Sequence, residues 1–281
     1  MIMGKVISKR ERALRILRAN EGVFRCPICQ NSLISNQDSG VCCSNKHAFD
    51  LARNGYLNLL VGPQNCQYDK ALFTARREVF LNGVYDPLVG EVAKLIREAG
   101  QKDPLVLDAG CGEGSFLAKL EKQLTGIFLG IDISRDGVRL AAAQDEPVLW
   151  CVADLATLPL SDASLDVIVN VLSPANYGEF ERVLKPDGIL VKVLPGEDYL
   201  REIRERLGDK KHYSNQEVLA HLEANVKIRK SSHLYYRVPV NPDLWEAMVA
   251  MTPLTRHREV QGDAPAYLTV DLQVIQGILS N

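Results

Sequence analysis

The chain has 281 residues, 46% hydrophobic and 24% charged, with a formal net charge of −2. This length favours one large domain plus a small one. No apolar run approaches the roughly 18 residues of a membrane span, and the start has no apolar signal segment. Seven cysteines, the first four clustered, fit a reducing compartment. We therefore expect a cytoplasmic protein, in which any nucleic acid is held by local basic patches.

The composition changes along the chain and divides it into four segments. Residues 1–23 form a basic extension whose amphipathic pattern is compatible with a short basic helix, and the interpretation that we favour for it is a solvated appendage. Residues 24–60 form a cysteine-rich domain, and residues 61–75 are expected to be a linker because turn residues occur there without periodicity. Residues 76–281 form the large domain, in which a helical signal ends at Gly100.

The cysteine-rich segment has the spacing of a structural zinc site. Cys26 and Cys29 form C-x2-C, and Cys43 with His47 forms C-x3-H thirteen residues further on. Three thiolates and one imidazole suit zinc, and the ion supplies folding energy to a module with a small core. Cys42 is an alternative third ligand. Because four protein ligands leave no open position, the metal is expected to be structural and not catalytic.

The large domain alternates predicted strands and helices. This pattern indicates an α/β fold with a mostly parallel sheet covered on both faces. The predicted strands are 104–110, 126–132, 148–154, 165–172 and 188–195, with later ones at 226–240 and 266–275. The predicted helices are 115–124, 135–144 and one near 241–251.

Acidic residues and glycines follow three successive strands. The first strand ends at Asp108, and Gly110, Gly112 and Gly114 then form a tight turn before a helix. This D-x-G-x-G-x-G spacing lacks the last glycine of the dinucleotide fingerprint, so it favours a cofactor without a pyrophosphate. The next two strand ends carry acids. They are Asp132, placed to accept two ribose hydroxyls, and Asp154, placed to accept from an adenine amino group.

Over residues 85–195 this arrangement resembles the class I, Rossmann-like S-adenosylmethionine-dependent methyltransferases. The resemblance implies that Asp108 and the Gly110–Gly114 turn lie beside the methionine part of the cofactor. It also implies that Asp132 binds the ribose, and that Asp154 with Leu155 binds the adenine. Phe116 and Leu117 either pack against the cofactor or belong to the core.

A longer set of motifs resembles the RlmA-type bacterial 23S rRNA (guanine-N1) methyltransferases over residues 24–255. These motifs are CPIC, HAFDLARNGYLNLL, ARREVFLNGVYDPL, VLDAGCGEG and MTP. The resemblance implies methylation of one guanine in a hairpin loop of 23S ribosomal RNA by a homodimer whose paired domains form the RNA cleft. Three features depart from the family: a less basic linker, the extension before Phe24, and Tyr199, a cofactor-site candidate, in place of histidine.

Several other residues are candidates for the site. Asn170 either holds the edge of the target base or caps a turn, and Tyr85 either covers the cofactor or packs between domains. The sequence does not identify the general base that takes the N1 proton. The candidate phosphate contacts are Lys46, Arg53, Arg76 and Arg77. We expect the zinc module to dock RNA and to be separate from the catalytic domain. Its unfolding should therefore leave cofactor binding intact.

Two other functions compete with this interpretation. A small-molecule methyltransferase would share the same core, but it does not explain the zinc ligands. A non-enzymatic RNA-binding protein with a vestigial catalytic domain would have a broken cofactor motif, whereas Asp108, Gly110, Gly112 and Asp132 are all present.

Overall fold

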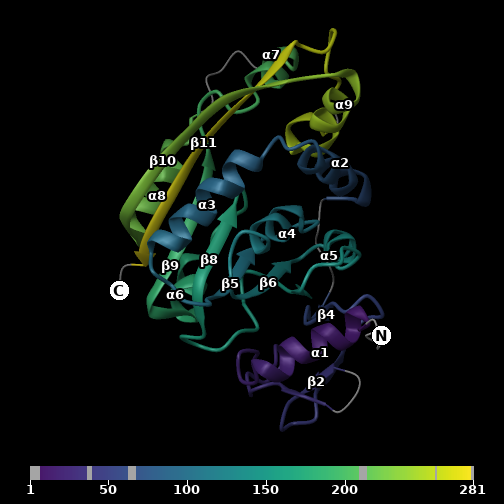
Figure 1. Ribbon diagram of the computed structural model, residues 1–281, viewed down its shortest axis with the longest axis vertical. Helices are drawn as coiled ribbons and strands as arrows, with labels where there is room; N and C mark the ends of the chain where they lie inside the picture. Colours follow the sequence, from purple (N-terminus) through teal and green to yellow (C-terminus); the bar gives the residue numbers. More distant parts are fainter. Residues whose placement is uncertain (1–6, 37–39, 63–67, 209–213, 257, 280–281) are drawn as a thin grey trace, which may run out of the picture.

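The computed structural model describes all residues except 1–6, 37–39, 63–67, 209–213, 257 and 280–281. Its centre is an eight-stranded sheet in the order β10-β11-β9-β8-β5-β6-β7-β4 (Figure 1). Strands β4 to β9 within it run parallel. Strand β11 pairs antiparallel with β9, and β10 pairs antiparallel with β11, so β11 is the one described strand of this sheet that runs against the others. The bounds are β4 (Leu57–Asn58), β5 (Leu105–Ala109), β6 (Ile127–Asp132), β7 (Val148–Val152), β8 (Leu165–Val171), β9 (Leu184–Pro195), β10 (Val226–Pro239) and β11 (Tyr267–Leu279). The predicted α/β fold with a mostly parallel sheet is confirmed.

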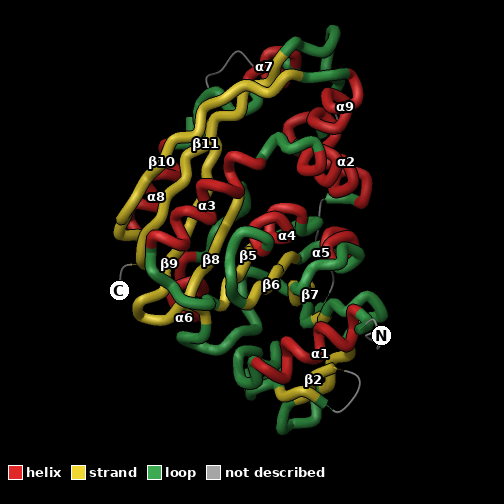
Figure 2. Tube along the Cα trace, viewed as in Figure 1, coloured by secondary structure: helices red, strands yellow, loops and turns green. Residues whose placement is uncertain are grey.

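Helices cover both faces of this sheet, as Figure 2 shows in red against yellow strands. One hydrophobic cluster joins the sheet to α2 (Lys70–Leu81), α3 (Asp86–Glu98), α4 (Ser115–Glu121), α5 (Arg135–Ala141), α7 (Arg201–Arg206) and α9 (Pro242–Met251). The other joins it to α1 (Lys9–Ala19), α6 (Tyr177–Val183), α8 (Gln216–Asn225) and the zinc module. Strand pleating divides β5 between them: Val106 faces the first cluster, and Leu105 and Leu107 face the second.

The helix ends follow local sequence signals. Asp69 caps α2, since its Oδ1 accepts a hydrogen bond from the Leu72 amide at 2.9 Å. Gly100, with φ 75°, follows the end of α3, as the sequence predicts. Helix α2 begins at Lys70, so residues 70–75 of the predicted linker are helical. Residues 63–67 of that linker lie outside the described part of the chain.

The N-terminal helix is a packed element. A short basic helix is confirmed at α1, but the favoured interpretation of a solvated appendage is wrong, because Ala13, Leu14 and Leu17 are buried. Its basic side chains also reach the large domain: Lys9 Nζ donates to the Ala142 carbonyl at 3.2 Å, and Arg12 pairs with Asp145 at 3.1 Å.

The cysteine-rich module combines its own small sheet with a strand of the large one. Its own antiparallel strands are β1 (Ile34–Ser35), β2 (Gly40–Cys42) and β3 (Ala48–Asp50). Strand β4, however, pairs with β7 through Leu57 and Cys151, and Phe24 bridges to Leu160. The predicted boundaries at 60 and 75 stay predictions, but the module shares a core with the sheet. In the described part of the chain, no helix is both long and apolar enough to cross a bilayer.

Candidate active site and metal site

The glycine-rich turn after β5 is held tightly against its neighbours. Gly110, Gly112 and Gly114 have φ values of 87°, 55° and 82°, a region that glycine enters without steric cost. The amides of Gly110 and Cys111 donate to the Ile131 carbonyl at 2.8 and 3.0 Å. A Cβ on Gly110 would lie 2.1 Å from Ser173 Oγ. Only glycine therefore lets this turn lie against the loop that follows β8.

Asp132, the last residue of β6, fixes the other side of the turn. Its Oδ2 accepts from the Gly112 amide at 2.8 Å, and its Oδ1 accepts from the Ser134 amide at 2.7 Å. Burial raises the pKa of Asp132, while these amides and the Arg76 guanidinium oppose the shift. The carboxylate is thus oriented by backbone donors and still lines a cavity.

That cavity has a volume of about 1160 Å³ and lies at the carboxyl ends of the strands. The predicted residues that it brings together are Gly110, Asp132, Asp154, Leu155 and Tyr199. Its walls also include residues that the sequence did not single out: Ser173, Tyr177, Lys192, Arg204, His221 and Asn225. Because single-ligand pockets usually measure roughly 300–1,000 Å³, this one has room for a cofactor and part of a second molecule.

A second, smaller cavity of about 40 Å³ lies behind the glycine turn and is lined by Asp108, Tyr85, Phe116 and Tyr199. Asp108 is buried, and its Oδ1 has no hydrogen-bond partner among the described residues. Burial, and then the charges of Asp132 and Glu113, raise the pKa of Asp108 to about 8. Such an unpaired acceptor beside a glycine cradle fits the amino group of a methionine moiety.

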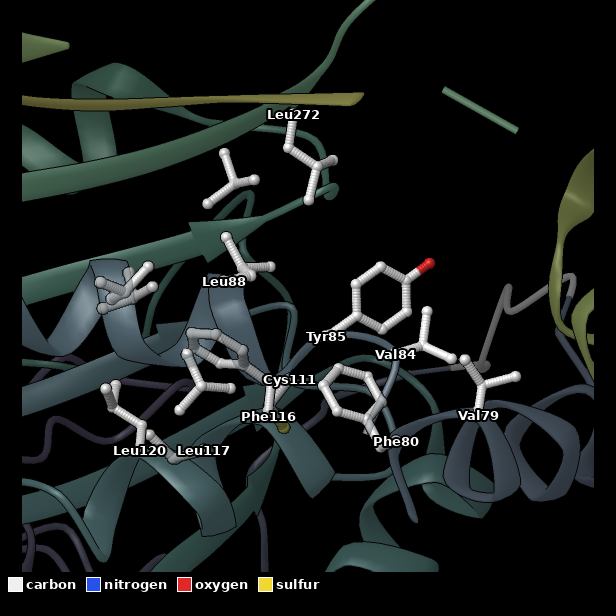
Figure 3. Packing of buried hydrophobic residues seen from close by; sticks show 14 of the residues in the cluster. Val79, Phe80, Val84, Tyr85, Leu88, Cys111, Phe116, Leu117, Leu120 and Leu272 are labelled. Atoms are coloured by element: carbon white, nitrogen blue, oxygen red, sulfur yellow. The ribbon is translucent and has the colours of Figure 1, made fainter. Parts of the chain in front are cut away.

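The aromatic candidates separate into different roles. Tyr85 Oη and Tyr199 Oη lie 2.6 Å apart, so Tyr85 reaches the large cavity only through Tyr199. Figure 3 shows Tyr85 beside Phe80 within the buried cluster. Phe116 lines the small cavity, whereas Leu117 is fully buried and lines neither of these two cavities. For Leu117 the core alternative is the one that the structure supports.

Asn170 uses its amide inside the protein. Its Nδ2 donates to the Ala109 carbonyl at 2.6 Å and to the Pro174 carbonyl at 3.3 Å, and its Oδ1 accepts from Lys192 Nζ. It is fully buried and is not among the residues that line the large cavity. A catalytic contact with the target base does not fit this geometry. The turn-holding alternative does, since the amide ties β8 to the loop after it.

The four candidate phosphate contacts do not lie together. Lys46 and Arg53 are exposed on the cysteine-rich module. Arg76 lines both cavities and lowers the pKa of Asp108, so it belongs to the cofactor region. Arg77 donates to the carbonyls of Leu140 and Glu113 at 2.6 and 3.4 Å, and this ties its guanidinium to the protein interior. Arg77 is therefore not placed to bind phosphate.

The predicted metal ligands converge. The ligand atoms of Cys26, Cys29, Cys43 and His47 all lie within 4.8 Å of one another. His47 Nδ1 is 3.4 Å from Cys26 Sγ and 3.5 Å from Cys43 Sγ, and the Sγ atoms of Cys29 and Cys43 are 3.6 Å apart. Zinc–sulfur bonds of about 2.3 Å place tetrahedral ligands at such separations. The site therefore fits zinc, and Cys42 is not part of it.

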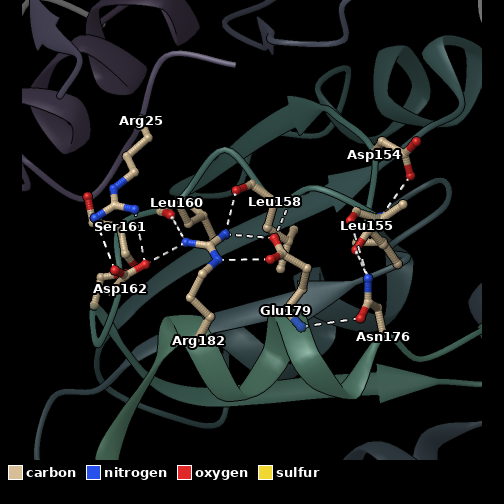
Figure 4. A network of polar contacts seen from close by, with 12 residues as sticks. Arg25, Asp154, Leu155, Leu158, Leu160, Ser161, Asp162, Asn176, Glu179 and Arg182 are labelled. Carbon is tan, nitrogen blue, oxygen red and sulfur yellow. Dashed lines mark hydrogen bonds and ion pairs between the residues drawn. The ribbon is translucent and has the colours of Figure 1, made fainter. Parts of the chain in front are cut away.

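A polar network connects the metal site to the cofactor wall (Figure 4). Arg25, next to a zinc ligand, makes two hydrogen bonds to Asp162, at 3.0 and 3.2 Å. Asp162 also pairs with Arg182, which binds Glu179 at 2.7 Å and the carbonyls of Leu158 and Leu160. Asn176 then donates to the carbonyls of Leu155 and Ala156. This network fixes the segment that begins with Asp154.

Comparison with known proteins agrees with these two sites. Residues 24–65 match the family described as "RlmA, N-terminal", a zinc ribbon, and residues 106–188 match a methyltransferase domain. The chain is 35% identical to YxjB of Bacillus subtilis (strain 168), whose name places it among the 23S rRNA (guanine-N1)-methyltransferases; the match covers 91% of this chain and 97% of YxjB. The chain belongs to this family.

A second member of the 23S rRNA (guanine-N1)-methyltransferase family is similarly related. The 23S rRNA (guanine(748)-N1)-methyltransferase of Streptomyces fradiae is 36% identical, over 84% of this chain and 86% of the relative. Among solved structures, YcgJ of Bacillus subtilis has a TM-score of 0.47 at 20% identity, covering 68% of this chain and 97% of YcgJ. For the present chain, the two matched families and the two sites identify S-adenosylmethionine as the cofactor and a structural zinc ion as the metal.

Proposed function

We propose that this protein transfers the methyl group of S-adenosylmethionine to N1 of a guanine in a hairpin loop of 23S ribosomal RNA. The observation that carries the proposal is the single cavity that begins at the three strand-end sites and continues to α8. A cofactor and the edge of a nucleobase fit in one such space. Strong sequence similarity to relatives named for this reaction supports the choice of substrate.

The cofactor half of the cavity follows from the acidic residues. Asp132 accepts hydrogen bonds from the ribose hydroxyls, and Asp154 with Leu155 holds the adenine. Asp108 and the Gly110–Gly114 turn receive the methionine part, with Phe116, Tyr85 and Tyr199 behind it. The bound cofactor supplies an electrophilic methyl carbon. The protein contributes alignment, since an in-line approach of the nitrogen removes much of the entropic barrier.

The target base occupies the other half of the cavity. A guanine in a hairpin must leave its stack to reach the cofactor. The loop after β8 and helix α8 form the wall available to it, and the rings of Tyr177 and His221 lie there, 5.2 Å apart between centroids. Aromatic walls suit an unstacked base, because every base presents a flat face.

Binding of the RNA outside this cavity is assigned to the zinc module. Lys46 and Arg53 are exposed there and would contact phosphates, which position RNA without reading its sequence. We further propose a homodimer whose paired domains form the RNA cleft, as the family resemblance implies. Because its proposed substrate is ribosomal RNA, we also propose that the protein acts in the cytoplasm.

Tritium transfer from labelled S-adenosylmethionine tests the proposal. We expect label in 23S ribosomal RNA and in an isolated hairpin substrate, and none in a small-metabolite extract. Primer extension should then stop next to a single guanine, because a methyl group on N1 blocks base pairing. The Asp132→Ala variant should transfer little label, while Asp187→Ala, which removes an exposed carboxylate, should behave as wild type. Label in the metabolite extract alone would contradict an RNA substrate.

A further inference from the structure

A lone cation is buried in the apolar strand β9. Lys192 follows Val191 and precedes Val193 in the run GILVKVLP, and it is 3% exposed. It nevertheless lines the large cavity. Among the described residues it has no ion-pair partner, so no carboxylate offsets the cost of burying its charge.

Two hydrogen-bond acceptors hold the Lys192 amine. Its Nζ donates to Asn170 Oδ1, from the register neighbour on β8, and to the Ser173 carbonyl at 2.5 Å. Ser173 is also the residue whose side chain lies against Gly110. The amine therefore lies beneath the loop that separates the cofactor turn from the α8 wall. In the proposed function, methyl transfer occurs at this junction.

Two protein acceptors leave one position on the Lys192 amine for a partner in the cavity. In a neutral lysine this position is the lone pair, and in an ammonium group it is the third N–H. The neutral form can therefore present its lone pair to a substrate while it keeps both contacts to the protein.

The environment of Lys192 Nζ favours the neutral amine. Burial lowers the pKa of Lys192 to about 8, and it is the sole cause of the shift. The neighbours across the sheet are uncharged, namely Asn170 on β8 and Ile275 on β11. The ionisable groups on the other walls of the cavity are Tyr68, Arg76, Asp132, Asp154, Tyr177, Tyr199, Arg204 and His221.

We propose that Lys192 is the base that takes the N1 proton of the target guanine, an inference that rests on the proposed function. The N1 electron pair forms the new N1–C bond while the S–C bond of the cofactor breaks, and its electron pair stays on sulfur. The N1 proton passes to Nζ. The positive charge of the sulfonium is thereby replaced by that of an ammonium group, which returns its proton to water after the product leaves.

Single-turnover methylation of 23S RNA between pH 6 and 10 tests this role. The wild-type rate should rise tenfold per pH unit and level off above about 8. Lys192→Met and Lys192→Arg should be slower by roughly 10²- to 10⁴-fold and should show no plateau near that pH. The matched control is Lys185→Met, on the same strand but outside the cavity, which should keep the wild-type profile. A Lys192→Met profile that keeps its plateau would show that the lysine only positions the loop, and would overturn the proposal.

A second measurement needs no activity. The unliganded protein labelled with ¹³C at lysine Cε should give one resonance, absent from Lys192→Arg, that titrates near pH 8. Titration at the pH of ordinary lysines would overturn the proposal, even if the Met variant failed to fold. If the wild-type protein labelled no RNA, the proposed function would fail, and with it the assignment of this base. If the wild-type protein methylated RNA and the Lys192→Met variant did so at the same rate, only the role of Lys192 would fail.

Discussion

At the scale of single residues, Asp132 illustrates how one carboxylate serves both the backbone and a ligand. Two amides orient it, and those bonds use one lone pair on each oxygen, so the remaining lone pairs face the cavity. The strand-end position of Asp132 was readable from the sequence. Its bond to Gly112 was not, because nothing in a one-dimensional pattern says which turn folds back over which strand.

Replacing Asp132 with alanine should weaken S-adenosylmethionine binding. Each lost hydrogen bond from a ribose hydroxyl to the carboxylate is worth about 1.5 to 3 kcal/mol, or roughly 10- to 150-fold in the dissociation constant. The affinity of Asp132→Asn should fall between those of the wild type and Asp132→Ala, since asparagine keeps one acceptor for the backbone amides. Isothermal titration calorimetry checks this, with Asp187→Ala as the control. Unchanged affinity in Asp132→Ala would remove this residue from the site.

Asp108 should make stability fall as pH rises. Its pKa is about 8 when folded and 3.8 in its ordinary state, so the folded protein keeps a proton that the unfolded chain releases. The contribution is complete below pH 3.8 and is lost as pH rises to about 8, by about 1.4 kcal/mol per pH unit. Asp108→Asn should remove this slope. Urea denaturation of the unliganded protein at pH 5 to 8 compares the two, and parallel curves would contradict the assignment.

At the scale of elements, the zinc module was the easiest part to predict and its attachment the hardest. Ligand spacing indicated Cys26, Cys29, Cys43 and His47, because metal coordination is a local constraint, but it left Cys42 as an alternative that only the three-dimensional arrangement removes. The pairing of β4 with β7 rests on two residues and has no periodic signal. The burial of α1 was missed for a similar reason, since its basic residues dominate the pattern while three apolar ones carry the packing.

Zinc content should distinguish the adjacent cysteines. We expect one zinc ion per chain in the wild type and in Cys42→Ser, and a large loss in Cys43→Ser, because only Cys43 lies with the other ligands. Atomic emission on protein purified without a metal-affinity column provides the measurement. The reverse order of the two variants would show that Cys42 is the ligand.

Cys26→Ala should affect cofactor binding as well as RNA methylation. The sequence alone suggested that the module unfolds independently, but Phe24 and Cys26 share a core with β5, β6 and β7, and Arg25 holds the network that ends at Leu155. Loss of the ligand should therefore weaken S-adenosylmethionine binding several-fold, measured by calorimetry with Cys42→Ala as the control. Wild-type affinity in Cys26→Ala would restore the independent docking module.

At the scale of the whole molecule, the sequence predicted the order of elements better than their assembly. Strands β5 to β9 of the parallel core were visible as apolar runs, and strand ends carrying acids indicated the cofactor side. The 1160 Å³ cavity was not visible, because residues from the β8 loop, β9 and α8 meet there only in three dimensions. One signal was available and passed over: Lys192 is the one charged residue in the buried run 188–194.

The pairing of β4 with β7 has a consequence for solubility. Without its short partner, β7 would expose the backbone groups of Cys151 and Val152 at the edge of an apolar strand, and such unpaired edges template aggregation. By holding the module that contains β4 in place, the zinc ion thereby protects the protein against self-association. Treating the protein with a strong chelator should release β4 and produce light-scattering oligomers before the helices melt by circular dichroism, and added zinc should suppress them. Chelated protein that stays monodisperse would show that β4 holds its place without the metal.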